Sequence, residues 1–219
     1  KYPQAKHLLT RWNSISRVDI IDSPAIRYAP GLSLLYEKEL PPQLGLSTDG
    51  GELSAITRLK DPEEPQLEFL AYLPSSLAYS LTESPHTLII EPKGGLDVLS
   101  SLYFNASQTK VIEANPLTTK LLRQELAQFS GDLYNKKNIQ VVTAYSRAAL
   151  KQDKDTYDLI VFSLTDVFGS TGTGLYGFSE NYLYTTESFA HILNRLSPDG
   201  LVSISLYLLP PPRQEGRIL

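Results

Sequence analysis

Residues 87–115, TLIIEPKGGLDVLSSLYFNASQTKVIEAN, decide the fold of this chain. The run Thr87–Glu91 is apolar until its last residue, as expected for a buried strand, and Pro92–Gly95 is a short glycine loop. A helical pattern over Leu96–Phe104 and a second strand, Thr109–Glu113, follow. Strand, glycine loop, helix and strand are the first half of a doubly wound, Rossmann-like sheet that binds nucleotides.

Strand and helix patterns continue to alternate after this stretch. The further strands are expected at residues 139–143, 157–164 and 200–208, and the further helices at 116–129 and 180–196. The cores of these strands are apolar throughout, which is typical of parallel strands that are covered on both faces. We therefore expect an α/β, nucleoside-binding domain over residues 86–219.

The first part of the chain has shorter patterns and more turn signals. Residues 1–60 predict a small N-terminal β region, with strands at Arg17–Asp22, Leu32–Tyr36 and Gln43–Ser47. Residues 61–85 predict a linker, with a hinge in its charged first part, and a connecting helix. The apolar spacing of this helix covers Leu67–Leu81, and Pro74 kinks it or divides it.

The composition of the chain argues against several classes of function. The 219 residues carry a net charge of −4 and no basic run, which argues against a nucleic-acid partner. The chain has no cysteine and three scattered histidines, so we expect no thiolate chemistry and no metal. No apolar run approaches membrane-spanning length. We expect a cytoplasmic domain, cut from a longer protein that can include membrane segments outside this chain.

Ligands of doubly wound sheets bind beyond the carboxyl ends of the strands. Gly94 and Gly95 would let a ligand approach the backbone closely, because glycine has no Cβ. Asp97 either contacts that ligand or caps its helix. A pyrophosphate cofactor favours a third glycine, which is absent, so a nucleoside without phosphates fits this loop better than NAD.

Two further strand ends carry polar residues. Glu113 lies about 20 residues beyond the loop, where a carboxylate can accept both hydroxyls of a ribose. The alternative is an exposed acid that caps the next helix. Ser163 and Asp166 follow the fourth strand, where an acid could deprotonate or orient an amine. The glycine-rich segment 169–181 predicts either a lid or a plain surface loop.

These residues together resemble the polyamine aminopropyltransferases, the spermidine synthase family, which have the class I S-adenosylmethionine methyltransferase fold. YDLIVFSLTD at 157–166 is the most telling stretch. FSGDLY at 129–134 and SENYLY at 179–184 are most similar to bacterial spermidine synthase-like domains that are often fused to membrane segments. The resemblance implies S-adenosylmethionine or its decarboxylated form as substrate, no metal, a polyamine as the amine acceptor, and a homodimer.

The resemblance also implies roles for single residues. Glu113 would bind the ribose, Tyr145 would stack on the adenine, and Asp166 would be catalytic. The family loop is G-G-G-D-G, whereas this chain has Glu91–Gly95, and the family's presumed base, an Asp, is replaced by Ser163. A serine is no base without a partner. Three functions therefore stay open: aminopropyl transfer, methyl transfer, and a non-catalytic domain that keeps the fold.

Overall fold

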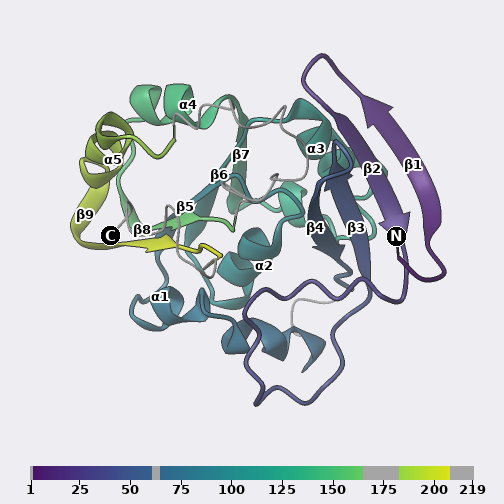
Figure 1. Cartoon of the computed structure of the whole chain (residues 1–219). Coiled ribbons are helices and arrows are strands. Elements are labelled where there is room, and N and C mark those ends of the chain that lie inside the picture. Colours follow the sequence, from purple (N-terminus) through teal and green to yellow (C-terminus); the bar gives the residue numbers. More distant parts are fainter. Residues whose placement is uncertain (1, 61–64, 165–182, 208–219) are drawn as a thin grey trace.

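The computed structural model describes residues 2–60, 65–164 and 183–207, and shows two sheets (Figure 1). The N-terminal region forms a four-stranded antiparallel sheet in the order β1-β2-β3-β4. The second sheet has five parallel strands and flanking helices, so the expected α/β fold with a small N-terminal β region is confirmed. The antiparallel strands are β1 (Lys6–Trp12), β2 (Arg17–Asp22), β3 (Gln43–Thr48) and β4 (Glu52–Thr57).

The parallel sheet has the order β7-β6-β5-β8-β9. The chain moves outward from the central β5 to β6 and β7, then returns to β8 on the other side of β5. The strand order therefore reverses between β5 and β8, and a ligand crevice is expected where these two strands end. The strands are β5 (His86–Ile90), β6 (Gln108–Glu113), β7 (Ile139–Thr143), β8 (Tyr157–Phe162) and β9 (Leu196–Ile204).

Helices cover both faces of the parallel sheet. Successive side chains of a strand point to opposite faces, so Leu88 and Ile90 pack with Ile192 in one apolar cluster while Ile89 packs with Leu99 in another. The helical segments are η1 (Pro65–Tyr72), α1 (Ser76–Ser80), α2 (Leu96–Tyr103), α3 (Pro116–Lys120), η2 (Leu121–Glu125), η3 (Leu133–Asn135), α4 (Ser146–Gln152) and α5 (Thr186–Leu193).

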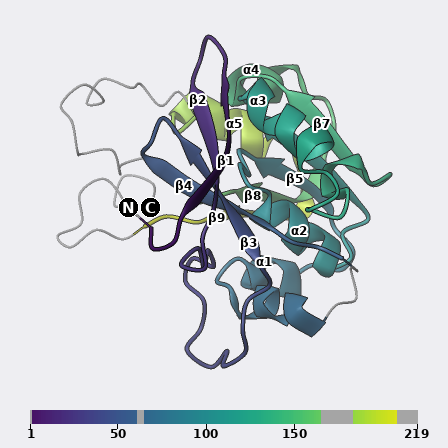
Figure 2. The ribbon, with the colours of Figure 1, turned by 90° about the vertical axis from the view of Figure 1, so that its right-hand side faces the viewer.

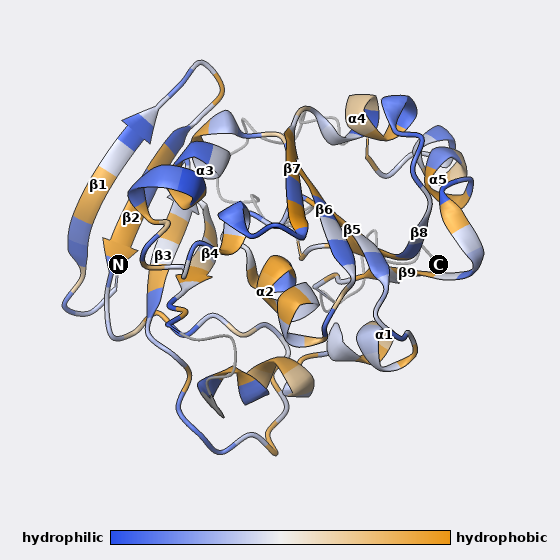
Figure 3. Cartoon of the chain, turned by 180° about the vertical axis from the view of Figure 1, so that it is seen from behind, coloured by the Kyte–Doolittle hydropathy of each residue, from blue (hydrophilic) through white to orange (hydrophobic). Residues whose placement is uncertain are grey.

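The antiparallel sheet shares its core with the α2 side of the parallel sheet. Val18, Ile20 and Leu46 belong to the same buried cluster as Ile89 and Leu99. α2 contacts both β4 of the antiparallel sheet and β5 of the parallel sheet, and it lies between them in Figure 1. Hydrophobic stretches run along α2 and the strands of both sheets (Figure 3). Residues 1–60 are therefore packed into the main core through apolar contacts.

The loop that joins β2 to β3, residues 23–42, lies beside η1 and α1 in two views (Figures 1 and 2). The Ser33 N–H donates a hydrogen bond to the Tyr72 carbonyl oxygen at 3.0 Å. A Cβ on Gly31 would lie 2.7 Å from Cγ of Pro74, which shows how closely the two segments approach. Together they form one wall of the cavity described below.

The predicted strand at Leu32–Tyr36 is wrong. This segment makes turns, in which the Leu32 N–H bonds to the Ala29 carbonyl and the Tyr36 N–H bonds to the Ser33 carbonyl. Leu34 and Leu35 are almost fully exposed. No neighbouring strand pairs with these residues in the described part of the chain, and apolar composition alone does not supply one.

Two predicted helices are shorter than expected. The 116–129 segment is α-helical only to Lys120 and then widens, because the Leu126 N–H bonds to the Leu121 carbonyl five residues earlier. Leu121, Leu122 and Leu126 of this segment are buried. Within the described residues, the last helix begins at Thr186, where the Thr185 side chain accepts a hydrogen bond from the Ser188 N–H.

Several elements were not predicted. The sequence patterns predicted no strand at β1 or β4 and no helix at α4. β9 begins at Leu196, four residues before the predicted start of this strand at residue 200. Residues 197–200 lie inside β9, at the place where its pairing with β8 shifts register. The connecting helix is divided at Pro74 into η1 and α1, as one of the two expectations stated.

Candidate functional site

A cavity of about 600 Å³ opens at the carboxyl ends of β5 and β8, where the strand order reverses. Its floor is the β5–α2 loop together with the residues that follow β8. One wall is built by the end of η1, by α1 and by the 23–42 loop, and the opposite wall is β9 and the residues after it. A volume of this size suits a drug-sized ligand.

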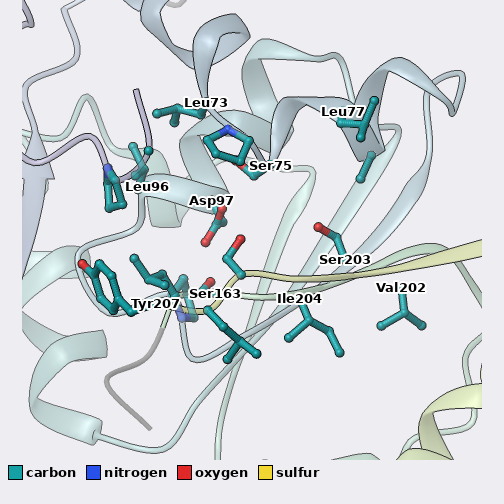
Figure 4. A pocket seen from close by; sticks show the side chains of 18 of the residues that line it. Leu73, Ser75, Leu77, Leu96, Asp97, Ser163, Val202, Ser203, Ile204 and Tyr207 are labelled. Carbon is teal, nitrogen blue, oxygen red and sulfur yellow. The ribbon is translucent and has the colours of Figure 1, made fainter. Parts of the chain in front are cut away.

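Asp97 places a carboxylate in this cavity. The left-handed Gly95 occupies the N-cap position of α2, so Asp97 is not the cap, and it lies in the first turn of the helix. Its side chain points into the cavity (Figure 4). Burial raises the pKa of Asp97, and the nearby Ser163 hydroxyl acts in the opposite direction. The positive end of the helix dipole favours a negative charge here.

Ser163 faces Asp97 from the end of β8 (Figure 4). The residue is 4% exposed, and its backbone N–H donates to the Ile90 carbonyl at 3.2 Å, which holds it beside β5. Its hydroxyl oxygen makes no hydrogen bond of good geometry to any described residue. An unsatisfied buried hydroxyl is costly. A polar ligand group between Ser163 and Asp97 would satisfy both side chains.

The rest of the cavity is lined by both apolar and polar side chains. Leu73 and Leu77 line it on one side. On the other side, Ser203 of β9 points toward the cavity, whereas its neighbours Val202 and Ile204 point to the opposite face of the sheet (Figure 4). Leu77 is 65% exposed and lies at the rim. The site therefore combines the Asp97 carboxyl and the Ser163 hydroxyl with leucine side chains and further hydroxyl groups, an arrangement that can orient a ligand through a few polar contacts.

The two glycines of the loop serve packing inside the chain. The Gly94 N–H donates to Ser54 Oγ at 3.0 Å, and a Cβ on Gly94 would lie 2.2 Å from the Ala55 carbonyl oxygen. Gly95 has φ +88°, and its Cβ would lie 3.0 Å from the Tyr134 ring. Both positions thus require glycine because β4 and Tyr134 press against the loop.

Glu113 ends β6 and is 2% exposed. One of its oxygens accepts the Lys93 N–H at 3.1 Å, and the other accepts the Asn115 N–H at 3.0 Å. Burial and the charge of Glu91 raise the pKa of Glu113 to about 8. Both oxygens are therefore bonded to backbone, and Glu113 is not among the residues that line the cavity.

Glu91, which the sequence interpretation did not single out, is the partner of Glu113. Its oxygens accept hydrogen bonds from the Ser146 hydroxyl and from the Ala114 N–H, and burial raises its pKa. The signal was present, because Glu91 directly follows β5, Glu113 ends β6, and neighbouring parallel strands end at the same edge. The two glutamates form an acid pair beside the cavity, in which Glu113 is buried and Glu91 is half-buried.

Tyr134 is a second residue that the sequence did not reveal. It is fully buried, and its hydroxyl has no hydrogen-bond partner among the residues described. Burial raises the pKa of Tyr134 well above its ordinary value, and the negative charges of Glu113, Asp97 and Glu91 act in the same direction. The phenol therefore lies close to all three acids of the site.

Among the remaining predicted site residues, Tyr145 does not join this cavity. Tyr145 is 67% exposed at the N-cap of α4 and is absent from the cavity lining. Asp166 lies outside the described residues. Of the predicted residues, the structure brings Asp97 and Ser163 together. The parts of the chain that are described contain no cluster of three metal-ligating side chains and no helix long and apolar enough to cross a membrane.

The order of the parallel strands and the site at their switch point define a Rossmann-like α/β domain, preceded by a small antiparallel sheet. More particularly, the fold is spermidine synthase-like. A spermidine synthase in complex with the transition-state analogue AdoDATO matches 91% of this chain with a TM-score of 0.59 and 19% identity. The spermidine synthase from Thermotoga maritima matches 91% of it with a TM-score of 0.58 and 18% identity.

The chain spans just over half the length of these spermidine synthases, 56% of one and 55% of the other. No protein-family model matches the sequence, and no curated protein matches it. The likeness therefore establishes the aminopropyltransferase-like fold. Function has to be argued from the cavity itself.

Proposed function

We propose that this chain is an amine-binding domain on a spermidine synthase-like fold, in which Asp97 binds the ammonium group of a small molecule. One observation carries the proposal: the half-buried Asp97 carboxyl faces the Ser163 hydroxyl inside the cavity, and this hydroxyl makes no hydrogen bond of good geometry among the described residues. An ammonium group has three N–H donors and can serve both oxygen acceptors. Its positive charge would also offset the cost of burying the carboxylate.

Two sources of the amine are compatible with the fold. One is the aminopropyl arm of decarboxylated S-adenosylmethionine, and the other is an amine acceptor such as a polyamine. S-adenosylmethionine itself carries an α-carboxylate beside its amine, and this carboxylate would be repelled by Asp97. The charge of Asp97 therefore supports the decarboxylated compound over the carboxylated one, and amine chemistry over methyl transfer.

If the domain is a transferase, the acceptor nitrogen attacks the propyl carbon next to the sulfonium. The C–N bond forms, the C–S bond breaks, and neutral methylthioadenosine leaves with the bonding electron pair. The nitrogen releases one proton, for which Asp166 is the proposed base. A sulfonium is a good leaving group, so positioning of the two reactants supplies most of the acceleration.

A second candidate is a ligand-binding domain without transfer chemistry. The observation that favours it is the state of Glu113, whose two oxygens already accept the Lys93 and Asn115 backbone N–H groups. A ribose would have to displace these bonds. In this alternative Asp97 still binds an amine, but no methylthioadenosine is produced.

Calorimetric titration tests the proposal. The ligands are decarboxylated S-adenosylmethionine, S-adenosylmethionine, methylthioadenosine and spermidine, each added to the wild type and to Asp97→Asn. We expect the substitution to weaken the amine-bearing ligands about 10- to 100-fold, the loss of roughly 1.5–3 kcal/mol for hydrogen bonds to a charged group. Any binding of methylthioadenosine, which has no aliphatic ammonium group, should not change.

The matched control is Asp199→Asn, an exposed aspartate outside the cavity lining, which should leave all affinities unchanged. Equal affinity of the amines for the wild type and Asp97→Asn would refute the proposal. A second assay incubates the protein with decarboxylated S-adenosylmethionine and spermidine. Release of methylthioadenosine would support the transferase, and no release would support the binding domain.

A further inference from the structure

We infer that the amine bound in this cavity carries hydroxyl groups, as an amino alcohol does, and that Ser203 and Ser205 bind these groups. This inference rests on the proposed amine-binding function and defines its ligand class. It follows from the side chains that the parallel sheet presents to the cavity at the ends of β8 and β9.

The α2 side of strands β8 and β9 changes from apolar to polar where the cavity begins. The pairing places Leu159 beside Leu201, and both pack in the apolar cluster that includes residues of α2. Two residues further along each strand, on the same face, Val161 lies beside Ser203. The serines of β9 therefore belong to the cavity, and the apolar packing of the sheet ends before them.

Ser163 and Ser205 form the next pair on this face. The Ser205 N–H donates to the Phe162 carbonyl at 3.4 Å, which continues the parallel pairing and sets Ser205 beside Ser163. Neighbouring strands lie about 5 Å apart, and Ser203 precedes Ser205 by about 7 Å along the strand. Three serines that line the cavity thus lie together on one face of the sheet.

This serine face lies within reach of a ligand held by Asp97. The Ser163 hydroxyl faces Asp97, and the Ser203 side chain points toward the same cavity (Figure 4). A covalent bond spans about 1.5 Å, so a ligand group about four bonds from the ammonium nitrogen can reach the position of Ser205. A hydroxyl at that distance from the nitrogen is typical of a short amino alcohol.

The chemistry of serine favours hydroxyl groups on the ligand. A serine hydroxyl both donates and accepts, so a neutral ligand hydroxyl can pair with it in either direction. An alkyl chain on the same face would remove the serines from water without giving them a hydrogen bond, which is unfavourable. Leu73 and Leu77, on the other side of the cavity, can pack against the carbon atoms of either ligand.

Serine is also small, so these positions could serve only to leave space for the ligand. Alanine separates the two explanations, because it keeps the space and removes the hydroxyl. If the hydroxyls bind the ligand, Ser203→Ala/Ser205→Ala should weaken amino alcohols and spare alkyl amines. If the serines only leave space, both ligand classes should bind the double variant as they bind the wild type.

The test is calorimetry at pH 7.5 with butylamine, 3-amino-1-propanol and 3-amino-1,2-propanediol. The first two ligands are matched in size, because a hydroxyl replaces the terminal methyl group. The diol should bind the wild type more tightly than butylamine. In Ser203→Ala/Ser205→Ala the diol should lose about two- to tenfold in affinity for each hydrogen bond removed, while butylamine should keep its affinity.

Two controls accompany the double variant. Ser14→Ala removes an exposed hydroxyl outside the cavity lining and should leave all affinities unchanged. Unchanged butylamine binding verifies that the double variant keeps its site folded. If butylamine binding is lost as well, the single variants Ser203→Ala and Ser205→Ala decide, and each should weaken the diol more than it weakens butylamine.

The outcomes separate the two proposals. If butylamine binds the wild type as tightly as the diol does, or if the alanine variants retain the affinity for the diol, the inference fails. Loss of affinity for these amines in Asp97→Asn would then leave amine binding intact. If no amine binds, both proposals fail. A preference for the diol that the alanines remove and Ser14→Ala preserves supports the inference.

Discussion

The same end of the parallel sheet holds three acids in different environments. Asp97 points into the cavity, where burial raises its pKa and a ligand cation can reach it. Glu91 and Glu113 interact with each other and are bonded to the chain, and Glu113 is buried. Two carboxylates so placed cannot both ionise without mutual repulsion, so the pair holds a proton near neutral pH.

This proton predicts how stability depends on pH. The folded-state pKa of Glu113, about 8, lies above the ordinary value of 4.5, so the folded state binds the proton more tightly than the unfolded state. The stability contribution is complete below pH 4.5 and is lost as the pH rises toward 8. Glu91→Gln removes one of the two charges and should stabilise the protein at pH 8–9 by roughly 2–4 kcal/mol.

The measurement is urea unfolding of the wild type and Glu91→Gln between pH 5 and 9. Glutamine suits position 91 because the Ser146 hydroxyl can accept its N–H, whereas at position 113 its amide would face a backbone N–H. Glu83→Gln, at an exposed glutamate, is the control and should follow the wild type. If the free energy of unfolding changes with pH in the same way for the wild type and for Glu91→Gln, the pair does not share a proton.

At the level of elements, the β5–α2 loop and β4 determine each other's position. The loop backbone meets Ser54 and Ala55 so closely that no side chain fits at Gly94. In the sequence, Gly94 predicts close approach of a ligand to the backbone. The structure shows that β4 of the N-terminal sheet makes that approach.

Gly94→Ala should therefore destabilise the protein by about 3 kcal/mol, because its Cβ would lie 2.2 Å from the Ala55 carbonyl oxygen and β4 would have to move. Gly51→Ala is the matched control. The nearest atom to a Cβ at Gly51 is 3.9 Å away, so this change should be nearly neutral. Guanidinium unfolding at pH 6 measures both, and an equal effect of the two substitutions would contradict the close packing of loop and strand.

A feature could be predicted from the sequence when neighbouring residues determine it, and could not be predicted when it depends on residues distant in the chain. Apolar runs such as Leu88–Ile90 are covered on both faces and could be recognised from the sequence, and the acids at strand ends could be placed at one edge. The edge strand β1 is largely exposed, so its pattern carries little hydrophobic signal. The roles of Gly94 and Tyr134 could not be predicted, because each depends on a segment distant in the chain.

For the whole molecule, the antiparallel and parallel sheets share one apolar cluster that includes Val18, Leu46, Ile89 and Leu99. Polar contacts join them as well, since Asn115 bonds to both Asn13 and Ser16 across the two parts. The sequence predicts a hinge at residues 60–65. A shared core instead favours unfolding of both sheets in one cooperative step.

Native-state amide hydrogen exchange in low concentrations of denaturant measures this cooperativity. The amides of β3 (Gln43–Thr48) and β5 (His86–Ile90) should exchange with the same free energy and the same dependence on denaturant. A lower free energy and a shallower dependence for β3 would mean that residues 1–60 unfold separately from the parallel sheet.

The central claim is that the Asp97 carboxyl binds a ligand ammonium group. Carbon-detected NMR titration of the side-chain carboxyl, assigned by the loss of its signal in Asp97→Asn, tests it most directly. Without ligand the pKa of Asp97 should lie above its ordinary value of 3.8, because the carboxyl is buried. With saturating decarboxylated S-adenosylmethionine the pKa should fall by at least one unit, since a neighbouring cation favours the charged form. An Asp97 pKa that does not change when the amine binds would contradict the claim.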